Sequence, residues 1–377
     1  MDASTIGKAA QFLETLRPEV RALPRYNAGL SIEYVRKHYG VDKVAKLGSN
    51  ENPYGPSPKV REAIALAAAE IALYPEPSCD PLREVFAARL QVAPERLIFG
   101  NGSEDLIAVA AHTFLEPGAQ VVTFAPSFGL HVIWPQAAGA DVTTVTINRD
   151  YGMDADAIVA ALQPGTRMLI FGNPSNPVGT SIGADDLRRI LAHISPQTLL
   201  VFDEAYLEYA ATDPSYPDFL AMLQDAETPW LMLRTMSKAY GLAGVRVGYA
   251  VASDPELISL MDRVRAPFNV NRLAQVAAIA ALDDMEYVQR VVTQTVAERE
   301  RMSAALTSLG YRTAPSRANF LFVQAHEDAT ELAKRLLTRG VIVKPWRDSG
   351  FEDHLRVSIG LPADNDSFLD AWRALAR

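Results

Sequence analysis

A lysine in an unusual setting is the strongest chemical signal in the sequence. Lys238 lies in the segment RTMSKAYGLAGVRVGY (234–249), directly after an apolar run typical of a buried strand. Lysine is among the side chains least often buried, so a lysine here points to a role, such as forming a Schiff base with a carbonyl group. Arg246, flanked by glycines in the same segment, is suited to binding a phosphate. The alternative is that both are ordinary surface residues.

Two further segments place hydrogen-bonding groups after predicted strands. In IFGNGSEDLI (98–107) a glycine turn separates a strand from a helix, and its free N–H groups suit a phosphate, although a plain connection is the commoner role. In GNPSNPVGT (172–180), Asn173 and Asn176 could donate to a ligand oxygen. Equally, these asparagines could satisfy their own turn.

An acidic residue ends another apolar run. Asp203, in VFDEAYLEY (201–209), ends a predicted strand at its carboxyl edge, where a buried carboxylate is costly unless it has a cationic partner. It is therefore either a helix N-cap or the counter-ion of a protonated ring nitrogen.

Alternating elements must position these groups. Short β-branched runs alternate with amphipathic stretches, which predicts a mostly parallel sheet with helices on both faces. The predicted strands lie at 97–101, 120–125, 167–172, 198–203, 230–235 and 245–251.

The chain divides into three predicted parts. Residues 1–45 form an N-terminal arm, 46–283 a large domain and 284–377 a small C-terminal domain. The segment 271–308 is almost all helix, broken near Asp283. The pattern after it predicts a smaller α+β unit.

The order of these motifs resembles the fold-type I pyridoxal-phosphate enzymes, specifically the class I/II aminotransferases. Further segments are similar to the histidinol-phosphate aminotransferase family: KLGSNENPYGPSP (46–58), LYPEP (73–77), RAPFNVNRLAQ (265–275), VIVKPW (341–346) and LRVSIG (355–360). The resemblance covers nearly the whole chain. It implies an α/β fold whose large domain has a mostly parallel seven-stranded sheet. It also implies pyridoxal 5′-phosphate as cofactor and ping-pong amino transfer between L-histidinol phosphate and 2-oxoglutarate.

The resemblance assigns roles around the cofactor ring. Lys238 would bind the cofactor covalently and then move the proton of the substrate α-carbon. Asp203 would keep the ring nitrogen protonated. Asn176 and Tyr206 would bind the ring hydroxyl oxygen, and Phe128 would stack on the ring where many relatives carry tyrosine.

The resemblance also assigns a phosphate site. The backbone of Ser103 and Glu104, the hydroxyl of Ser237 and the guanidinium of Arg246 would hold the cofactor phosphate. Tyr74 matches a tyrosine that reaches this phosphate from a neighbouring subunit, which implies a homodimer with shared active sites.

Three residues are expected to bind substrates. Arg356 matches an arginine that holds a carboxylate, here that of 2-oxoglutarate or glutamate. Tyr26 matches a substrate-facing tyrosine. Lys344 stands where many relatives have arginine, so it keeps the charge and loses the bidentate fork. The neighbouring Trp346 would equally suit a phenyl or phenol side chain.

Alternative functions follow from the same motifs. An aromatic amino acid aminotransferase, acting on phenylalanine or tyrosine, shares the mechanism. An amino-acid phosphate decarboxylase is compatible with the same arginine. A non-enzymatic regulator that binds the cofactor would need a DNA-binding segment, for which the arm is too short and insufficiently basic.

The composition excludes other classes of protein. The chain has 377 residues, of which 49% are apolar and 21% charged, as in ordinary globular proteins. Its net charge of −9 argues against nucleic-acid or anionic-membrane partners. No apolar run is long enough to span a membrane, so we expect a soluble, cytoplasmic protein. The single cysteine, Cys79, and the scattered histidines predict no metal site.

Overall fold

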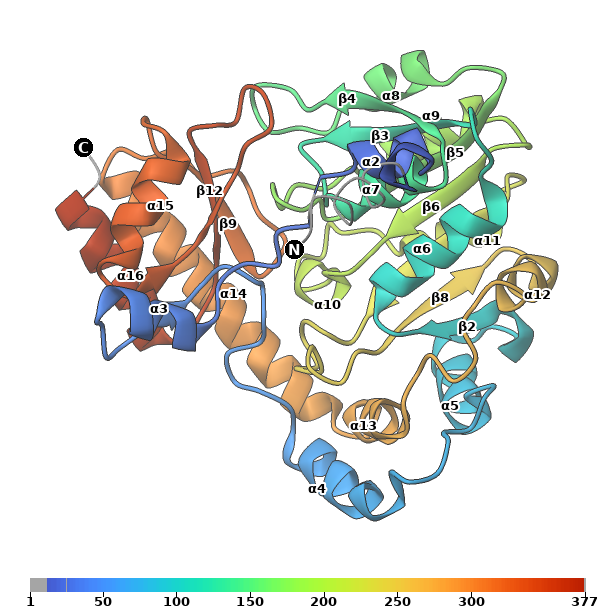
Figure 1. The fold of residues 1–377 in the computed structure, drawn as a ribbon, viewed down its shortest axis with the longest axis horizontal. Coiled ribbons are helices and arrows are strands. Elements are labelled where there is room, and N and C mark those ends of the chain that lie inside the picture. The colour runs from blue at the N-terminus through green and yellow to red at the C-terminus, as the bar shows by residue number, and fades with distance from the viewer. Residues whose placement is uncertain (1–11, 25, 376–377) are drawn as a thin grey trace.

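A seven-stranded sheet forms the centre of the computed structural model, which describes residues 12–24 and 26–375 (Figure 1). Its strand order is β2-β8-β7-β6-β5-β3-β4, and only β8 runs antiparallel to its neighbours. The predicted mostly parallel sheet is therefore confirmed. Its strands are β2 (Leu97–Gly100), β3 (Gln120–Ala125), β4 (Asp141–Thr146), β5 (Thr166–Gly172), β6 (Leu199–Asp203), β7 (Trp230–Thr235) and β8 (Gly248–Ala252).

The edge strand β4 is the one strand of this sheet that the apolar runs did not reveal. Its sequence DVTTVT is largely exposed, so it lacks the continuous apolar character of a strand covered on both faces. It pairs in parallel with β3 alone.

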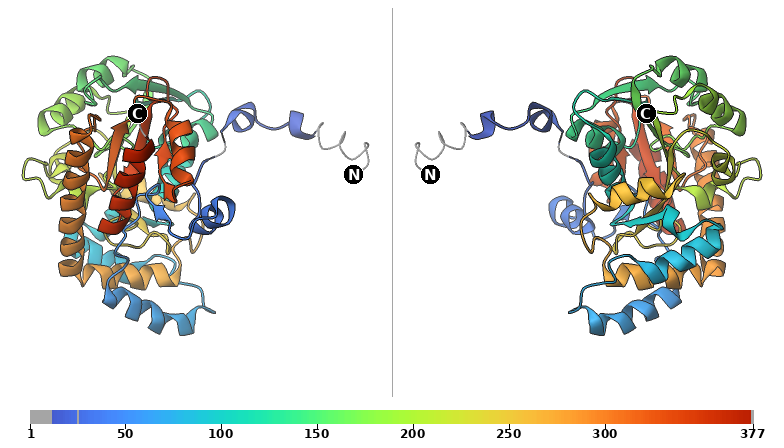
Figure 2. Two further views of the ribbon diagram at one scale, coloured as in Figure 1. Left: turned by 90° about the vertical axis from the view of Figure 1, so that its left-hand side faces the viewer. Right: turned by 90° about the vertical axis from the view of Figure 1, so that its right-hand side faces the viewer.

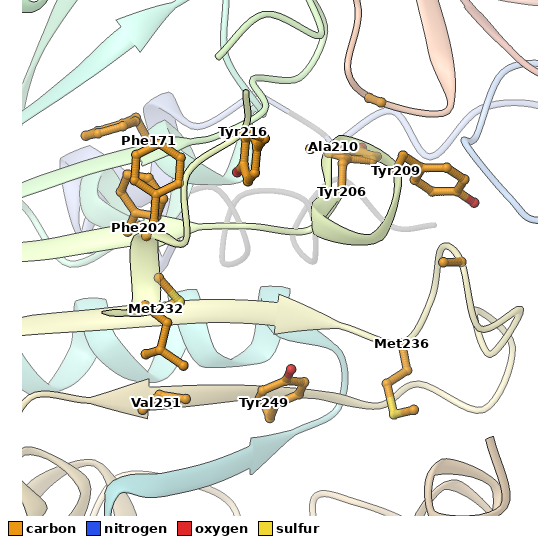
Figure 3. Close-up of a cluster of buried hydrophobic side chains, with 14 of the residues drawn as sticks. Phe171, Phe202, Tyr206, Tyr209, Ala210, Tyr216, Met232, Met236, Tyr249 and Val251 are labelled. Carbon is orange, nitrogen blue, oxygen red and sulfur yellow. The ribbon is translucent and has the colours of Figure 1, made fainter. Parts of the chain in front are cut away.

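Both faces of the large sheet are buried. Leu199 and Val201 contribute to one apolar cluster, whereas Leu200 and Phe202 contribute to another, as the two-residue period of a strand requires. Figure 3 shows Phe202 in the second cluster, beside side chains of neighbouring strands. The flanking helices are α5 (Asp80–Leu90), α6 (Ser103–Phe114), α7 (Leu130–Ala137), α8 (Ala155–Ala161), α9 (Ala184–His193), α10 (Leu207–Ala210), α11 (Phe219–Gln224) and α12 (Pro255–Asp262).

A smaller sheet follows the long helical segment. The predicted break near Asp283 is present, because α13 (Arg272–Leu282) ends there and α14 (Met285–Ser308) begins after Asp284. The smaller unit has its own apolar core, and α14 runs beside it (Figure 1). Its elements are β9 (Phe320–Gln324), β11 (Lys344–Pro345) and β12 (His354–Ser358) in the order β11-β12-β9, with α15 (Ala329–Leu337) and α16 (Pro362–Leu375).

The N-terminal part of the chain contacts both units. Helix α3 (Ile32–Tyr39) packs through Val35 against Leu337 and Ile342 of the smaller unit. Helix α2 (Pro18–Ala22) lies beside α7, where Arg17 donates to the carbonyl oxygen of Ala137 at 2.8 Å (Figure 2). The exact division into an arm, a large domain and a small domain stays a prediction.

Short elements complete the chain. Strand β1 pairs in parallel with β10 and so ties the start of the large unit to the smaller one. No helix among the described residues is long and apolar enough to cross a membrane. The remaining elements are β1 (Ala45–Lys46), α4 (Pro58–Ala67), η1 (Ala68–Glu70), η2 (Pro94–Arg96) and β10 (Val341–Ile342).

Candidate active site

The predicted site residues, apart from Tyr74, meet at one edge of the large sheet. Strands β2, β3, β5, β6 and β7 run parallel and all end at this edge, where open α/β sheets bind ligands. A cavity of about 550 Å³ lies here, closed on one side by residues of the smaller unit. Its lining includes Tyr26, Ser103, Glu104, Phe128, Asn176, Asp203, Tyr206, Ser237, Lys238, Arg246, Lys344 and Arg356.

Lys238 places its amine inside the cavity. Its Nζ donates to the carbonyl oxygen of Ser49 at 3.4 Å and lies 5.9 Å from the centre of the Tyr206 ring. Burial, followed by the positive charge of Arg356, lowers the pKa of Lys238 to about 8. About a tenth of the amine is therefore neutral at pH 7, far more than for a free lysine, and a nucleophile and base requires this neutral form.

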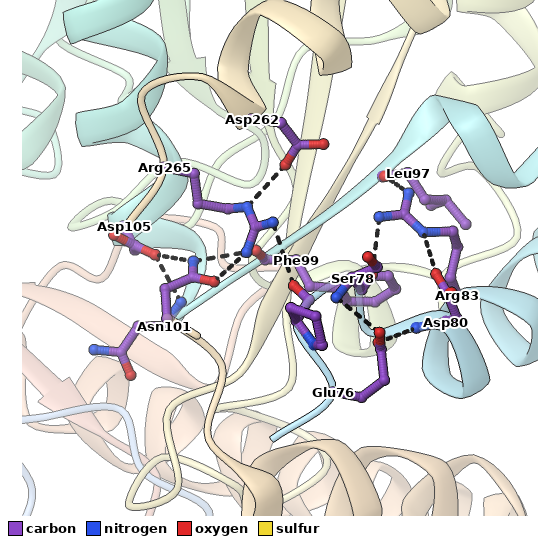
Figure 4. Close-up of polar contacts among 12 residues, drawn as sticks. Glu76, Ser78, Asp80, Arg83, Leu97, Phe99, Asn101, Asp105, Asp262 and Arg265 are labelled. Carbon is purple, nitrogen blue, oxygen red and sulfur yellow. Dashed lines mark hydrogen bonds and ion pairs between the residues drawn. The ribbon is translucent and has the colours of Figure 1, made fainter. Parts of the chain in front are cut away.

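The turn before α6 forms a place for an anion. Gly102 has a φ of 87°, and a Cβ atom there would collide with the guanidinium of Arg246, so glycine allows the cation to lie against the turn. The backbone N–H of Asn101 donates to Asp105 at 2.9 Å, which fixes the turn at the start of the helix (Figure 4). The N-terminal N–H groups of a twelve-residue helix thus face the cavity beside a cation.

Arg246 is held at this turn by several contacts. It donates to the carbonyl oxygen of Asn101 at 3.2 Å and to Ser237 Oγ at 3.4 Å, and it pairs with Glu104 at 3.2 Å. Thr235 Oγ1 in turn donates to Ser237 Oγ at 3.0 Å. The turn before α6 can lie close to the start of β8 only because residue 248 is glycine, since a Cβ there would collide with the backbone N of Ser103.

Asp203 is a buried carboxylate with defined partners. Only 5% of the residue is exposed, and its Oδ1 accepts from the N–H of Ala205 at 3.0 Å. Its Oδ2 accepts from His131 Nε2 at 3.1 Å, which leaves His131 Nδ1 to accept from Ser127 Oγ at 3.3 Å. Asp203 thus accepts from a backbone N–H two residues on, as an N-cap does, and also belongs to a hydrogen-bond network with His131 and Ser127.

The sequence analysis overlooked His131, which was grouped with the structural histidines. His131 follows Phe128 by three residues at the start of α7, and this spacing places the two side chains on one side of a turn. Their rings are 5.5 Å apart and nearly perpendicular. A histidine one turn after the predicted stacking aromatic was the signal that could have revealed it.

Arg356 comes from the smaller unit and is directed toward the loop after β5. It donates to Asn176 Oδ1 at 2.7 Å and to the carbonyl oxygen of Gly48 at 2.6 Å. Its Nε is buried and has no hydrogen-bond partner among the described residues. Burial lowers the pKa of this guanidinium, so an anion would be a favourable ligand here.

Lys344 and Tyr26 line another part of the cavity. Lys344 Nζ donates to the carbonyl oxygen of Asn27 at 2.6 Å. Burial, followed by the positive charges of Arg356 and Arg347, lowers the pKa of Lys344 to about 8. A phosphate would offset this clustering of positive charge.

Tyr74 lies apart from the other predicted residues. It is not among the residues that line the cavity, its exposed fraction is 77%, and its ring stacks on that of Phe268 at 4.5 Å. The structure of one chain therefore does not bring Tyr74 to its own site. Its predicted contact with another subunit stays a prediction.

The fold and this arrangement are those of an aminotransferase. The model of the family "Aminotransferase class I and II" matches residues 42–371, and the chain belongs to this family.

Individual proteins similar to this chain bear the name histidinol-phosphate aminotransferase. Histidinol-phosphate aminotransferase 1 of Mesorhizobium japonicum is 47% identical over 362 residues, which cover 96% of this chain and 98% of the relative. Histidinol-phosphate aminotransferase 3 of Rhizobium meliloti is 48% identical, over 95% of this chain and 96% of the relative. The crystal structure of histidinol-phosphate aminotransferase from Sinorhizobium meliloti in complex with pyridoxal-5′-phosphate superposes with a TM-score of 0.87 at 29% identity. That alignment covers 96% of this chain and 98% of the other.

Proposed function

We propose that the protein is a pyridoxal-phosphate-dependent histidinol-phosphate aminotransferase, which exchanges an amino group between L-histidinol phosphate and 2-oxoglutarate in histidine biosynthesis. The observation that carries the proposal is the buried Lys238 amine, which shares one cavity with a buried carboxylate and a helix N-terminus beside Arg246. The names of the relatives at 47% and 48% identity support this donor. They do not favour the aromatic amino acid alternative.

The residues present fit pyridoxal phosphate. Because Gly102 has no side chain, Arg246 can lie against the N-terminus of α6, where the backbone of Ser103 and Glu104 can meet a phosphate together with Ser237. At the other end of such a ligand, the oxygens of Asp203 are held in place and suit a protonated ring nitrogen. Phe128 lines the same cavity and offers an aromatic face to the ring.

The polar groups on the remaining side suit the ring oxygen. The amide of Asn176 and the hydroxyl of Tyr206 both line the cavity. Burial raises the pKa of Tyr206 to about 12, so its hydroxyl keeps its proton and can act as a donor. We assign these two residues to the ring oxygen of the cofactor.

The chemistry divides between the cofactor and the chain. When bound, pyridoxal phosphate supplies a carbonyl carbon that takes the amino group and a ring that withdraws electrons from the substrate α-carbon. Lys238 would hold the cofactor, and its neutral Nζ would then accept the α-proton and pass it to the former carbonyl carbon of the cofactor. Asp203 would keep the proton on the ring nitrogen, because a buried negative charge favours a protonated partner.

The substrates would be held by residues of the smaller unit and of the N-terminal segment that line the cavity. Arg356 suits the carboxylate of 2-oxoglutarate or glutamate, since its Nε is without a partner among the described residues. Lys344 and Tyr26 suit the phosphate of L-histidinol phosphate. The positive charge at Lys344 distinguishes this wall from one that accepts a neutral phenyl group.

A homodimer belongs to the same proposal. Tyr74 is exposed and outside the cavity of its own chain, so it could serve a cofactor phosphate only in another chain. Large apolar side chains are exposed near it, which favours coverage by a second copy. They are Leu66, Ile71, Leu73 and Phe268. A cytoplasmic location likewise stays a prediction.

A half-reaction tests the function. The protein is loaded with pyridoxal phosphate, and its visible absorption is followed while L-histidinol phosphate or phenylalanine is added without a keto acid. We expect bleaching at a low concentration of L-histidinol phosphate and only at a much higher one of phenylalanine. Lys238→Ala should not show it, whereas Lys59→Ala, which changes an exposed lysine, should behave as the unaltered protein. The reverse order of donors would indicate an aromatic aminotransferase, and the absence of any visible band would refute the cofactor.

A further inference from the structure

Asn50 lines the cavity from a buried and strained position. Only 1% of the residue is exposed, and its φ of 54° lies in the left-handed region. Asparagine tolerates this conformation better than most residues with a side chain. None of the roles assigned above uses it.

The hydrogen bonds around Asn50 fix the orientation of its amide. The backbone N–H of Asn50 donates to Ser358 Oγ at 2.8 Å. Ser358 has one hydroxyl hydrogen, which it donates to Asn50 Oδ1 at 2.8 Å. Because Oδ1 is the acceptor in this contact, the other end of the amide is the donor, and Nδ2 donates to Tyr206 Oη at 2.9 Å.

The direction of this last hydrogen bond determines what Tyr206 can do. Tyr206 Oη accepts from Asn50, so its own hydrogen is not used in that contact and can point into the cavity. The ring of Tyr206 is held in place by a perpendicular contact with Phe320 at 5.1 Å. The charged groups that act on the hydroxyl are Arg356 and Asp203.

We propose that Asn50 is a positioning residue that makes Tyr206 a hydrogen-bond donor to the ring oxygen of the cofactor. Ser358 holds the amide of Asn50 in the required orientation. Ser358 lies on β12, as does Arg356, so one strand of the smaller unit supports both the substrate-binding arginine and the donor to the cofactor. This inference rests on the proposed function, because it needs pyridoxal phosphate in the cavity.

The test reverses the polarity of the amide without changing its size. Asn50→Asp replaces the Nδ2 donor with a carboxylate oxygen that accepts from Tyr206, which turns the hydroxyl hydrogen away from the cofactor. Aspartate also tolerates the left-handed conformation. The measurement is the pH midpoint of the visible absorption of the bound cofactor, which does not depend on turnover. Loss of a donor to the ring oxygen should raise this midpoint, because a less stabilised negative oxygen favours the protonated form.

A double-mutant cycle separates the hydrogen bond from the added charge. We expect Asn50→Asp to raise the midpoint by about one pH unit, a tenfold tighter hold on the proton, when Tyr206 is present. In the Tyr206→Phe background, where only the charge acts, the shift should be less than half as large. Asn52→Asp is the matched control: Asn52 contacts the carbonyl oxygen of Ala239 instead of Tyr206, so its effect should be the same in both backgrounds.

Each outcome has a defined meaning. Equal shifts for Asn50→Asp with and without the Tyr206 hydroxyl would overturn the proposal. If Asn50→Asp does not fold, Ser358→Ala removes the hydroxyl that orients the amide and should raise the midpoint in the same direction. An unchanged midpoint in Ser358→Ala would then overturn the proposal. Absence of a visible band in the unaltered protein would instead refute the proposed function.

Discussion

Replacing Asp203 by asparagine tests the proposed contact with the cofactor ring. The new side chain would have nearly the same size, and its oxygen can still accept from the N–H of Ala205. His131 can adapt by moving its proton to Nδ1, where Ser127 Oγ is within reach. We therefore expect the fold to survive Asp203→Asn while the negative charge beside the ring nitrogen is lost.

The expected size of the effect follows from the burial of Asp203. Removing one partner of a buried ion pair costs about 3–5 kcal/mol. The lower end applies, because the amide still offers an oxygen, and about 3 kcal/mol corresponds to a hundredfold or greater loss of affinity. Asp203→Asn should thus raise the dissociation constant of pyridoxal phosphate by roughly two orders of magnitude and slow removal of the α-proton.

The assay is a titration of apo-protein with pyridoxal phosphate, followed by its visible absorption, together with single-turnover kinetics. Thermal unfolding of the apo-protein reports whether the fold is kept. Asp185→Asn is the control, because the Asp185 side chain is 91% exposed and pairs with the surface residue Arg188. A dissociation constant and a turnover rate within about threefold of the unaltered protein would refute the contact with the ring and leave Asp203 as a structural residue.

Three further predictions concern other parts of the site. The pKa of Lys238 is lowered to about 8, and only the neutral amine attacks a carbonyl, so the rate of cofactor uptake by the apo-protein should rise up to about pH 8 and then level off. Stopped-flow absorption measures this rate, and a midpoint near the pKa of free lysine would contradict the prediction. Lys344→Gln removes a charged contact worth about 1.5–3 kcal/mol, so KM for L-histidinol phosphate should rise at least about tenfold and that for phenylalanine by less than about threefold; equal changes would remove Lys344 from the phosphate site. If Tyr74 serves another subunit, mixing the weakly active Tyr74→Ala with inactive Lys238→Ala should restore activity through hybrid dimers, and no gain on mixing would argue against shared sites.

Local patterns in the sequence predicted most elements of the fold. The buried strands are continuous apolar runs because parallel strands are covered on both faces, and six of the seven strands of the large sheet could be predicted in this way. The exposed edge strand β4 lacks that signal. The break between α13 and α14 was also evident, because two acidic residues interrupt an otherwise apolar helical pattern.

Residue types and their spacing indicate which chemistry the chain carries. The Lys238 amine lies in the loop after β7, the Asp203 carboxylate ends β6, a phosphate-binding turn follows β2, and Arg246 lies just before β8. That all of them reach one cavity follows from the parallel strand order, which brings distant segments to a single edge.

Only the tertiary structure decided which side chains support those groups. His131 contacts Asp203 across 72 positions of the chain, and Ser358 contacts Asn50 across 308. No local pattern specifies such partners, because their contact depends on how α7 packs on the large sheet and on how β12 of the smaller unit packs against the segment after β1. The lowered pKa of Lys238 has the same origin, since it depends on burial and on Arg356 of the smaller unit. The sequence thus names the reacting groups, and the packing of the chain sets their protonation and orientation.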